Sequence, residues 1–237
     1  MEKFLHAIKC DSVSAGYDGA RIVWGASLNV GRGQVVGIVG KNGMGKSTLL
    51  KAIMGLLPVE DGQVAVNGVE VTGEYPYDIV KKGVGYVPQE EAIFSDLSVR
   101  ENLEVARSAG GGKGENEELV KKFFPRIPER RSQPAGSLSG GEQKMLLLSR
   151  PLLTGADILL IDEVSEGLQP TMVDKVGEVI SELAQSGAAI LLVEQNLDLV
   201  SRVCDRVAVM ENGVLGRFES LDGESDRLGK VTSMMWS

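Results

Sequence analysis

Short, continuous runs of apolar residues recur along the chain and alternate with segments of helical spacing. Residues 34–39, 158–161 and 189–193 are such runs, which predicts strands that are covered on both faces. Between the last two runs, apolar positions in residues 172–183 share one face of a predicted helix, which ends at Gly187. This alternation of strands and helices predicts an α/β fold, with a mainly parallel sheet and helices on its faces.

Hairpins are predicted before and after this pattern. Residues 5–39 read as several short strands with turns at 18–19 and 31–33, and residues 62–71 alternate around the turn Asn67-Gly68. A further short strand is expected at 83–87. Near the C-terminus, a short helix at about 196–204 precedes a hairpin around Asn212-Gly213, and the final stretch carries no interpretable pattern.

The region from about residue 90 to 150 has a different character. Ser98 and Glu101 form a capping-box pattern at a helix start, residues 109–114 predict a mobile glycine-rich surface loop, and residues 115–124 return to helical spacing. We therefore expect one domain over residues 1–237. In it, a mostly helical insert at about 90–150 separates core segments at about 1–89 and 151–220.

Composition narrows the function classes. The chain has 237 residues and a net charge of −8, so bulk electrostatics give no support to binding of nucleic acid or of an anionic membrane. Cys10 and Cys204 lie far apart in sequence, which favours reduced thiols over a metal-binding pair. No secretory leader is visible. The apolar runs are much shorter than the roughly 20 residues that span a bilayer, so we expect other chains to do any spanning.

Residues 40–48 read Gly-Lys-Asn-Gly-Met-Gly-Lys-Ser-Thr, the spacing of a phosphate-binding loop. Its glycines let backbone N–H groups turn toward a phosphate, Lys46 brings a positive charge, and the Ser47 hydroxyl can bind magnesium. A helix predicted at 47–54, with Gly55 at its end, points its N-terminal partial charge at the same anion. A chance match in a glycine-rich turn is the alternative, and the flanking strand and helix count against it. The segment indicates a nucleotide phosphate site.

Two adjacent acids, Asp162 and Glu163, follow the apolar run at 158–161. At the end of a buried strand beside a phosphate site, one acid can hold magnesium and the other can address an attacking water. Successive strand residues point to opposite sides, so the two acids need not share one role. A surface acidic pair is the alternative, and it is disfavoured because acids that follow a buried strand are costly to bury unless they are used.

Residues 138–143, Leu-Ser-Gly-Gly-Glu-Gln, form a second glycine-containing turn before a helix. Alone, this turn fits a helix cap with Ser139 as the capping residue, or a second anion site. Together with the phosphate loop and the acids, it resembles the signature of the ATP-binding subunits of ABC transporters, with Glu before Gln143. The resemblance covers nearly the whole chain. It implies an ATP hydrolase on a P-loop (RecA-like) core, with an N-terminal antiparallel β-subdomain and an inserted α-helical subdomain.

The resemblance also implies roles for individual residues. Glu163 would be the catalytic carboxylate, with Lys46 and Gln195 beside it, and Tyr17 would stack on adenine. The magnesium ion would be surrounded by Ser47, Gln89 and Asp162. The remaining contacts to ATP would come from the loop and the hexapeptide: Gly40, Asn42, Gly43, Met44, Gly45, Lys46, Ser47, Thr48, Ser139, Gly140, Gly141 and Gln143.

Partners follow from the same resemblance. Two helix starts can bind an anion, but only one carries a lysine, so a head-to-tail dimer that sandwiches two ATP molecules would use both. Residues 163–170, Glu-Val-Ser-Glu-Gly-Leu-Gln-Pro, and 192–196, Leu-Val-Glu-Gln-Asn, resemble ATPases of branched-chain amino acid importers and of related urea and amide importers. Such systems imply a homodimer or heterodimer, membrane permease subunits, an indirect solute-binding protein, and a cytoplasmic, membrane-peripheral location.

Three positions depart from the family pattern. Val164 stands where most relatives have proline, which predicts a looser turn after Glu163. Pro151 falls within the signature helix, where it should kink or end it. Gln195 stands where most relatives have histidine, and its amide can donate and accept hydrogen bonds but cannot become cationic. Because His6 is the only histidine and lies near the N-terminus, we expect catalysis without an ionisable histidine.

Other functions remain as alternatives to an importer ATPase. Soluble ABC ATPases of translation usually carry two such domains, and those of chromosomes insert a long coiled coil, whereas this chain has one domain and an ordinary insert. A small-molecule kinase leaves residues 138–143 unexplained. A regulatory subunit that does not hydrolyse ATP also fits the motifs.

Overall fold

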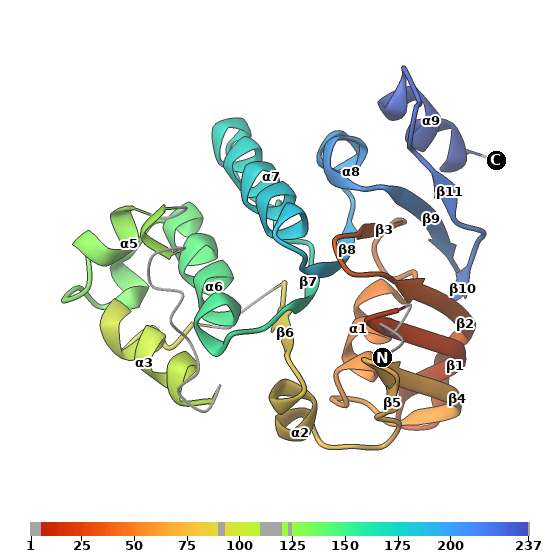
Figure 1. The fold of residues 1–237 in the computed structure, drawn as a ribbon, viewed down its shortest axis with the longest axis horizontal. Helices are drawn as coiled ribbons and strands as arrows, with labels where there is room; N and C mark the ends of the chain where they lie inside the picture. Colours follow the sequence, from red (N-terminus) through yellow and green to blue (C-terminus); the bar gives the residue numbers. More distant parts are fainter. Residues whose placement is uncertain (1–5, 90–92, 110–119, 123–124, 237) are drawn as a thin grey trace.

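The computed structural model describes residues 6–89, 93–109, 120–122 and 125–236. Figure 1 shows three parts side by side: an antiparallel sheet, a central sheet with helices against it, and a helical lobe. This arrangement confirms the predicted α/β fold with an antiparallel β-subdomain and an inserted helical segment.

The antiparallel sheet has the strand order β2-β1-β4-β5. Its strands are β1 (Ile8–Tyr17), β2 (Ala20–Val30), β4 (Val59–Val66) and β5 (Val69–Glu70). Where several short strands were predicted, β1 and β2 are two long ones. Their pairing shifts register between Cys10 and Val13 and again before Ala15, and such bulges interrupt the alternation that marks a continuous strand. The predicted hairpin at Asn67-Gly68 is confirmed, with φ values of 50° and 76°.

The central sheet has the order β10-β9-β3-β8-β7-β6, and β11 also pairs with β9. Its strands are β3 (Val35–Val39), β6 (Val84–Val87), β7 (Ile158–Asp162), β8 (Ala189–Glu194), β9 (Arg206–Glu211), β10 (Val214–Leu215) and β11 (Glu219–Ser220). The pairs β3·β8, β3·β9, β7·β8 and β6·β7 are parallel, whereas β10 and β11 run antiparallel to β9. The mainly parallel sheet is therefore confirmed, and the hairpin at Asn212-Gly213 has a shorter second strand than predicted.

Helices cover both faces of the central sheet. They include α1 (Lys46–Ile53), α2 (Pro76–Lys81), α7 (Pro170–Gln185), α8 (Leu197–Val203) and α9 (Arg227–Met234). The predicted helices at 47–54, 172–183 and 196–204 are confirmed with small changes of boundary, while α2 and α9 were not predicted. Within the described residues, no helix is both long and apolar enough to cross a membrane.

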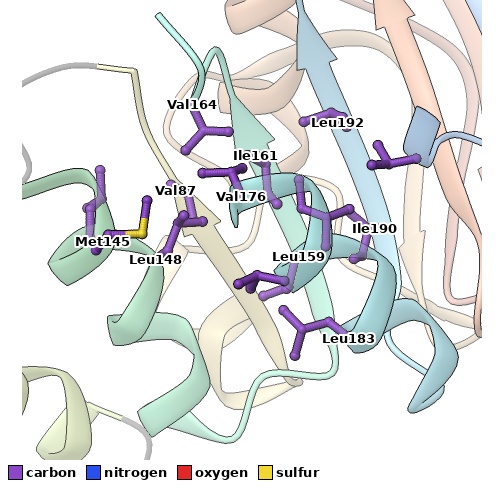
Figure 2. Packing of buried hydrophobic residues seen from close by; sticks show 14 of the residues in the cluster. Val87, Met145, Leu148, Leu159, Ile161, Val164, Val176, Leu183, Ile190 and Leu192 are labelled. Atoms are coloured by element: carbon purple, nitrogen blue, oxygen red, sulfur yellow. The ribbon is translucent and has the colours of Figure 1, made fainter. Parts of the chain in front are cut away.

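Alternate residues of β7 supply two hydrophobic cores. Ile158 and Leu160 face a core shared with α1 and the antiparallel sheet, whereas Leu159 and Ile161 face the opposite core. Figure 2 shows that second core, in which the sheet packs against α7 and the helical lobe through Val87, Leu159, Ile161, Ile190, Leu192, Val176, Leu183, Met145 and Leu148. Because both faces are apolar, β7 reads as an uninterrupted apolar run in the sequence.

The helical lobe contains α3 (Val99–Ala109), α5 (Arg126–Glu129), a 3₁₀ turn (Ala135–Ser137) and α6 (Gly140–Thr154). The capping box at the start of α3 is confirmed, because Glu101 N–H donates to the Ser98 hydroxyl and Ser98 N–H donates to the Glu101 carboxylate. Residues 120–122 are helical, and the rest of the predicted loop and helix beyond residue 109 lies outside the described residues.

Helix α6 continues through Pro151 to Thr154 and ends at Gly155, which has a left-handed φ of 74°. Proline therefore does not end the helix at its own position. The expected division at 150/151 falls inside α6, and we propose that the helical segment extends to Thr154.

Candidate nucleotide site

The phosphate loop connects the end of β3 to the start of α1. Gly43 and Gly45 have φ values of 78° and 100°, which a residue with a side chain rarely adopts. At Gly40 the reason is space, because a Cβ atom there would lie 2.4 Å from the Met210 carbonyl oxygen. Gly45 caps α1, so the backbone N–H groups at the start of that helix lie in the loop. This local geometry is the one expected of an anion-binding loop.

Lys46 lies inside the loop and is almost fully buried. Its Nζ donates hydrogen bonds to the carbonyl oxygens of Gly40, at 2.8 Å, and Lys41, at 2.9 Å. It also forms an ion pair with Glu163, with 3.1 Å between Nζ and Oε1. The ammonium group is therefore held at the centre of the loop and next to the candidate catalytic acid.

Ser47 and Asp162 meet at the carboxyl end of β7. The Ser47 hydroxyl donates to Asp162 Oδ1 at 2.9 Å, and the Tyr86 hydroxyl donates to Asp162 Oδ2 at 3.2 Å. Burial raises the pKa of Asp162, and the two hydrogen bonds oppose that shift. A hydroxyl and a carboxylate oxygen side by side match the hard oxygen ligands that Mg²⁺ prefers, so this pair fits the implied ion.

Glu163 occupies the turn that follows β7. Its φ is +44°, an uncommon value for a residue other than glycine, and its N–H donates to the Val193 carbonyl oxygen at 2.9 Å. The turn is packed as well as hydrogen-bonded, because Val164 is fully buried. We predicted a looser turn here because Val164 replaces a proline. Burial of Val164 and the hydrogen bonds from Ser165 to Glu194 restrain the turn.

Gln195 joins the phosphate loop to this acid. Its Nε2 donates to Asn42 Oδ1 at 2.7 Å and to Glu163 Oε2 at 2.8 Å. The parallel pairing of β3, β8 and β7 brings the three residues together, because each follows the carboxyl end of one of these strands. An amide at this position links two parts of the site without adding charge.

Gln89 reaches the same carboxylate from β6. Its Nε2 donates to Glu163 Oε2 at 2.9 Å and to Glu166 Oε2 at 2.6 Å. The structure thus brings Gln89 into the site beside Glu163, and its role as a magnesium neighbour stays a prediction. The backbone carbonyl of Gln89 accepts a hydrogen bond from Lys144 Nζ on α6, which ties this residue to the helical lobe.

Tyr17 lies at the end of β1 and is 41% exposed. Lys51 of α1 lies over its ring, with 5.9 Å between Nζ and the ring centroid. The ring is therefore available at the surface near α1, and its stacking on adenine stays a prediction.

The hexapeptide forms the start of α6 in the helical lobe. Ser139 caps the helix in a complete capping box with Glu142, and Gln143 Nε2 donates to the Leu138 carbonyl oxygen at 3.1 Å. A cavity of about 610 Å³ opens here, with Ser139, Gly140 and Gly141 in its wall. In Figure 1, α6 and α1 lie on opposite sides of β6 and β7. The helix start at Ser139 therefore lies apart from the phosphate loop of the same chain.

The motifs that carry this chemistry fall within one family match. A model of the ABC transporter family matches residues 23–166, which include the phosphate loop, the hexapeptide and the two acids. The chain belongs to the ABC transporter ATP-binding family. It is accordingly an ABC-type ATPase, as its motifs predicted.

Similar proteins and structures support this assignment. The chain is 36% identical to the high-affinity branched-chain amino acid transport ATP-binding protein BraG of Pseudomonas aeruginosa, over 86% of this chain and 88% of that protein. It is also 30% identical to the lipopolysaccharide export system ATP-binding protein LptB of Escherichia coli, over 86% of each. A solved ATP-binding cassette of an ABC transporter in its ADP conformation matches with a TM-score of 0.81 and 25% identity, over 97% of this chain and 98% of that one.

Tyr86 and Glu194 are among the residues with contacts in the site that were missed from the sequence. Tyr86 lies in a predicted strand, and its hydroxyl contact with Asp162 depends on the pairing of β6 with β7. Glu194 is an acid directly after an apolar run, the same signal that marked Asp162 and Glu163, and it was not singled out.

Proposed function

We propose that this ATPase drives an importer of branched-chain or other hydrophobic amino acids, through separate membrane subunits. The similarity to BraG over most of both chains carries the proposal. It is supported by the segments 163–170 and 192–196, which contain Glu163 with the turn that follows it, and Gln195. The chain is also similar to LptB, whose name denotes an export system. The direction of transport and the identity of the solute are therefore what the experiment must test.

The chemistry assigned to the site follows from its contacts. Lys46 and the glycine-framed N–H groups hold the phosphates of ATP, and Ser47 and Asp162 hold magnesium, with Gln89 as a further neighbour. When bound, the ion offsets charge on the phosphate oxygens. Glu163 orients and accepts a proton from the attacking water, while Gln195 fixes that carboxylate relative to Asn42.

A second ATPase subunit completes each site in this proposal. Ser139, Gly140 and Gly141 form an anion-binding helix start that has no lysine and borders a cavity, whereas the phosphate loop has the lysine but lies elsewhere in the chain. A head-to-tail pair, either two copies of this chain or this chain with a related subunit, brings the two together. Closing and opening of the pair transmits ATP turnover to permease subunits, on the cytoplasmic face of the membrane.

Solute choice belongs to the other subunits, so the test must include them. We expect the ATPase to co-purify with its membrane subunits, and ATP turnover in proteoliposomes to rise with leucine, isoleucine or valine plus the solute-binding protein. Lys46→Ala serves as the control for turnover by this chain. Stimulation by urea or short amides instead supports the alternative importer, and a complex that moves solute outward or lacks membrane subunits contradicts the proposal.

A further inference from the structure

Glu194 is a buried acid for which the proposed chemistry has no role. It is the last residue of β8 and is only 1% exposed. Along β8, Ile190 and Leu192 face the core that contains α7, whereas Leu191 and Val193 face the core that contains α1. The alternation of strand residues therefore directs Glu194 to the α7 face of the sheet.

Four hydrogen bonds converge on its carboxylate. Ser165 donates twice, from its N–H to Oε1 and from its hydroxyl to Oε2, each at 2.8 Å. The N–H groups of Gln195 and Asn196 donate to Oε2 at 3.2 Å and 3.4 Å. The carboxylate thus joins the turn that follows β7 to the loop that follows β8.

The donors explain how an acid is tolerated at this depth. Burial raises the pKa of Glu194, and the hydrogen bonds from Ser165, Asn196 and Gln195 act in the opposite direction. All four hydrogen bonds are donated to the carboxylate, and an ionised carboxylate can accept all of them. A neutral amide of the same size could not accept all four bonds.

The two segments that Glu194 joins carry Glu163, which is proposed to act on the attacking water, and Gln195, which is proposed to hold the Glu163 carboxylate in place. Ser165 lies two residues after Glu163, and Gln195 directly follows Glu194. Glu163 holds a left-handed backbone, which costs free energy and persists only where neighbouring contacts determine it. Its side chain also accepts a hydrogen bond from Gln195.

We propose that Glu194 is a positioning residue for ATP hydrolysis, which clamps the Ser165 turn to the Gln195 loop and so fixes the distance between Glu163 and Gln195. The proposal rests on the proposed function for the hydrolytic roles of those two residues. The contacts of the clamp continue from Ser165 toward the cavity beside Ser139. Leu168 N–H donates to the Ser165 carbonyl oxygen, and Gly167 and Leu168 line that cavity. The clamp therefore links the hydrolytic acid to the wall of the cavity where a partner's nucleotide would bind.

The test combines kinetics with hydrogen exchange on purified full-length protein. Glu194→Gln keeps size but removes acceptors, and Ser165→Ala removes one donor and is the milder variant if the first does not fold. We expect Glu194→Gln to lower kcat roughly tenfold or more, with a Kd for MgATP within about threefold of wild type. Ser165→Ala should lower kcat less, and the double variant should match Glu194→Gln alone because both act through one contact.

Ser201→Ala is the matched control. Its hydroxyl is also buried and donates to a backbone carbonyl, that of Asp198 in α8, away from the clamp. It should leave kcat near the wild-type value. Wild-type kcat in folded Glu194→Gln, or effects of Glu194→Gln and Ser165→Ala that multiply fully, overturns the proposal.

Hydrogen exchange separates this inference from the proposed function. Glu194→Gln should speed exchange at the amides of Ser165 and Gln195, whether or not the protein hydrolyses ATP. Faster exchange in a protein that ignores ATP overturns the proposed function and leaves the clamp supported. Unchanged exchange at both amides overturns the clamp even if ATP turnover is normal.

Discussion

Lys46 and Glu163 form a buried ion pair, with 3.1 Å between Nζ and Oε1 and side-chain exposures of 3% and 4%. Each charge offsets the cost of burying the other, because both side chains are almost completely shielded from water. The ammonium that we assign to the phosphates is thus the same one that holds the acid we assign to the attacking water. We therefore expect ATP binding and hydrolysis to be linked through this pair.

Lys46→Ala should affect both nucleotide binding and stability. Loss of the charge weakens MgATP binding, and the acid left alone in the interior should lower the free energy of unfolding by roughly 3 kcal/mol. Urea unfolding and a nucleotide-binding titration measure the two effects. Lys81→Ala removes an exposed lysine and should change neither. The double variant Lys46→Ala/Glu163→Gln should regain much of the stability but not the binding, and equal destabilisation of single and double variants would contradict the pairing.

Gln195→Ala should separate turnover from binding. Without the bridge from Asn42 to Glu163, kcat should fall roughly 100-fold while the Kd for MgATP changes little. Gln195→His should retain more activity and should add an inflection to the kcat–pH profile near pH 6–7, since the imidazole titrates in that range. His6→Ala should leave the wild-type profile unchanged, and a profile that changes in that variant would contradict catalysis without histidine.

Glu142 should stabilise the signature helix in a pH-dependent way. A hydrogen bond from the Ser139 N–H lowers the pKa of this carboxyl below its ordinary value of 4.5. The stabilisation is therefore present above pH 4.5 and is lost as the pH falls through the lower, folded-state pKa. Glu142→Gln should cost about 0.5–1 kcal/mol at neutral pH, and that cost should vanish in acid. Unfolding curves at several pH values measure this, with Glu211→Gln as the charge control; a cost independent of pH would contradict it.

Mixed variants should reveal the shared site. Lys46→Ala disables the phosphate loop of its own protomer. Ser139→Arg blocks the helix start that we expect to complete the ATP site of the partner protomer. If two copies of this chain pair head to tail, each variant alone lacks an intact site, while a mixed dimer keeps one. Mixing the purified variants should therefore restore part of the ATPase rate. Ser137→Arg places the same charge two residues away on an exposed position and should be active alone; no recovery on mixing would exclude a shared site between copies of this chain.

Elements with a long or distinctive pattern could be predicted from the sequence. The buried strands β3, β7 and β8 read as apolar runs because both their faces are covered, and the loop and acids at their ends follow directly. Helix α9 was missed because it is short and its one fully buried residue is Val231, so it has little apolar pattern to detect. Pro151 was expected to kink or end the helix, and α6 continues past it to Thr154, with Leu152 and Leu153 buried.

The hydrogen-bond partners of Gln89 and Glu194 on distant segments could not be predicted from the sequence. Gln89 was expected near magnesium, and its amide bonds to Glu163 and Glu166, because the path of the backbone after β6 sets its reach. Glu194 was visible as an acid after an apolar run, but its bonds to Ser165 depend on the parallel pairing of β7 with β8. Motifs therefore identified the chemical groups, and the sheet determined which of them meet.

Phosphate release and MgATP binding, measured together in wild type and Glu163→Gln, test the central claim most directly. We expect wild type to bind and hydrolyse MgATP, and the variant to bind it at least as tightly while its rate falls by roughly 100-fold or more. A variant that hydrolyses ATP at the wild-type rate would remove Glu163 from the chemistry. A wild-type protein that does not bind MgATP would contradict the site as a whole.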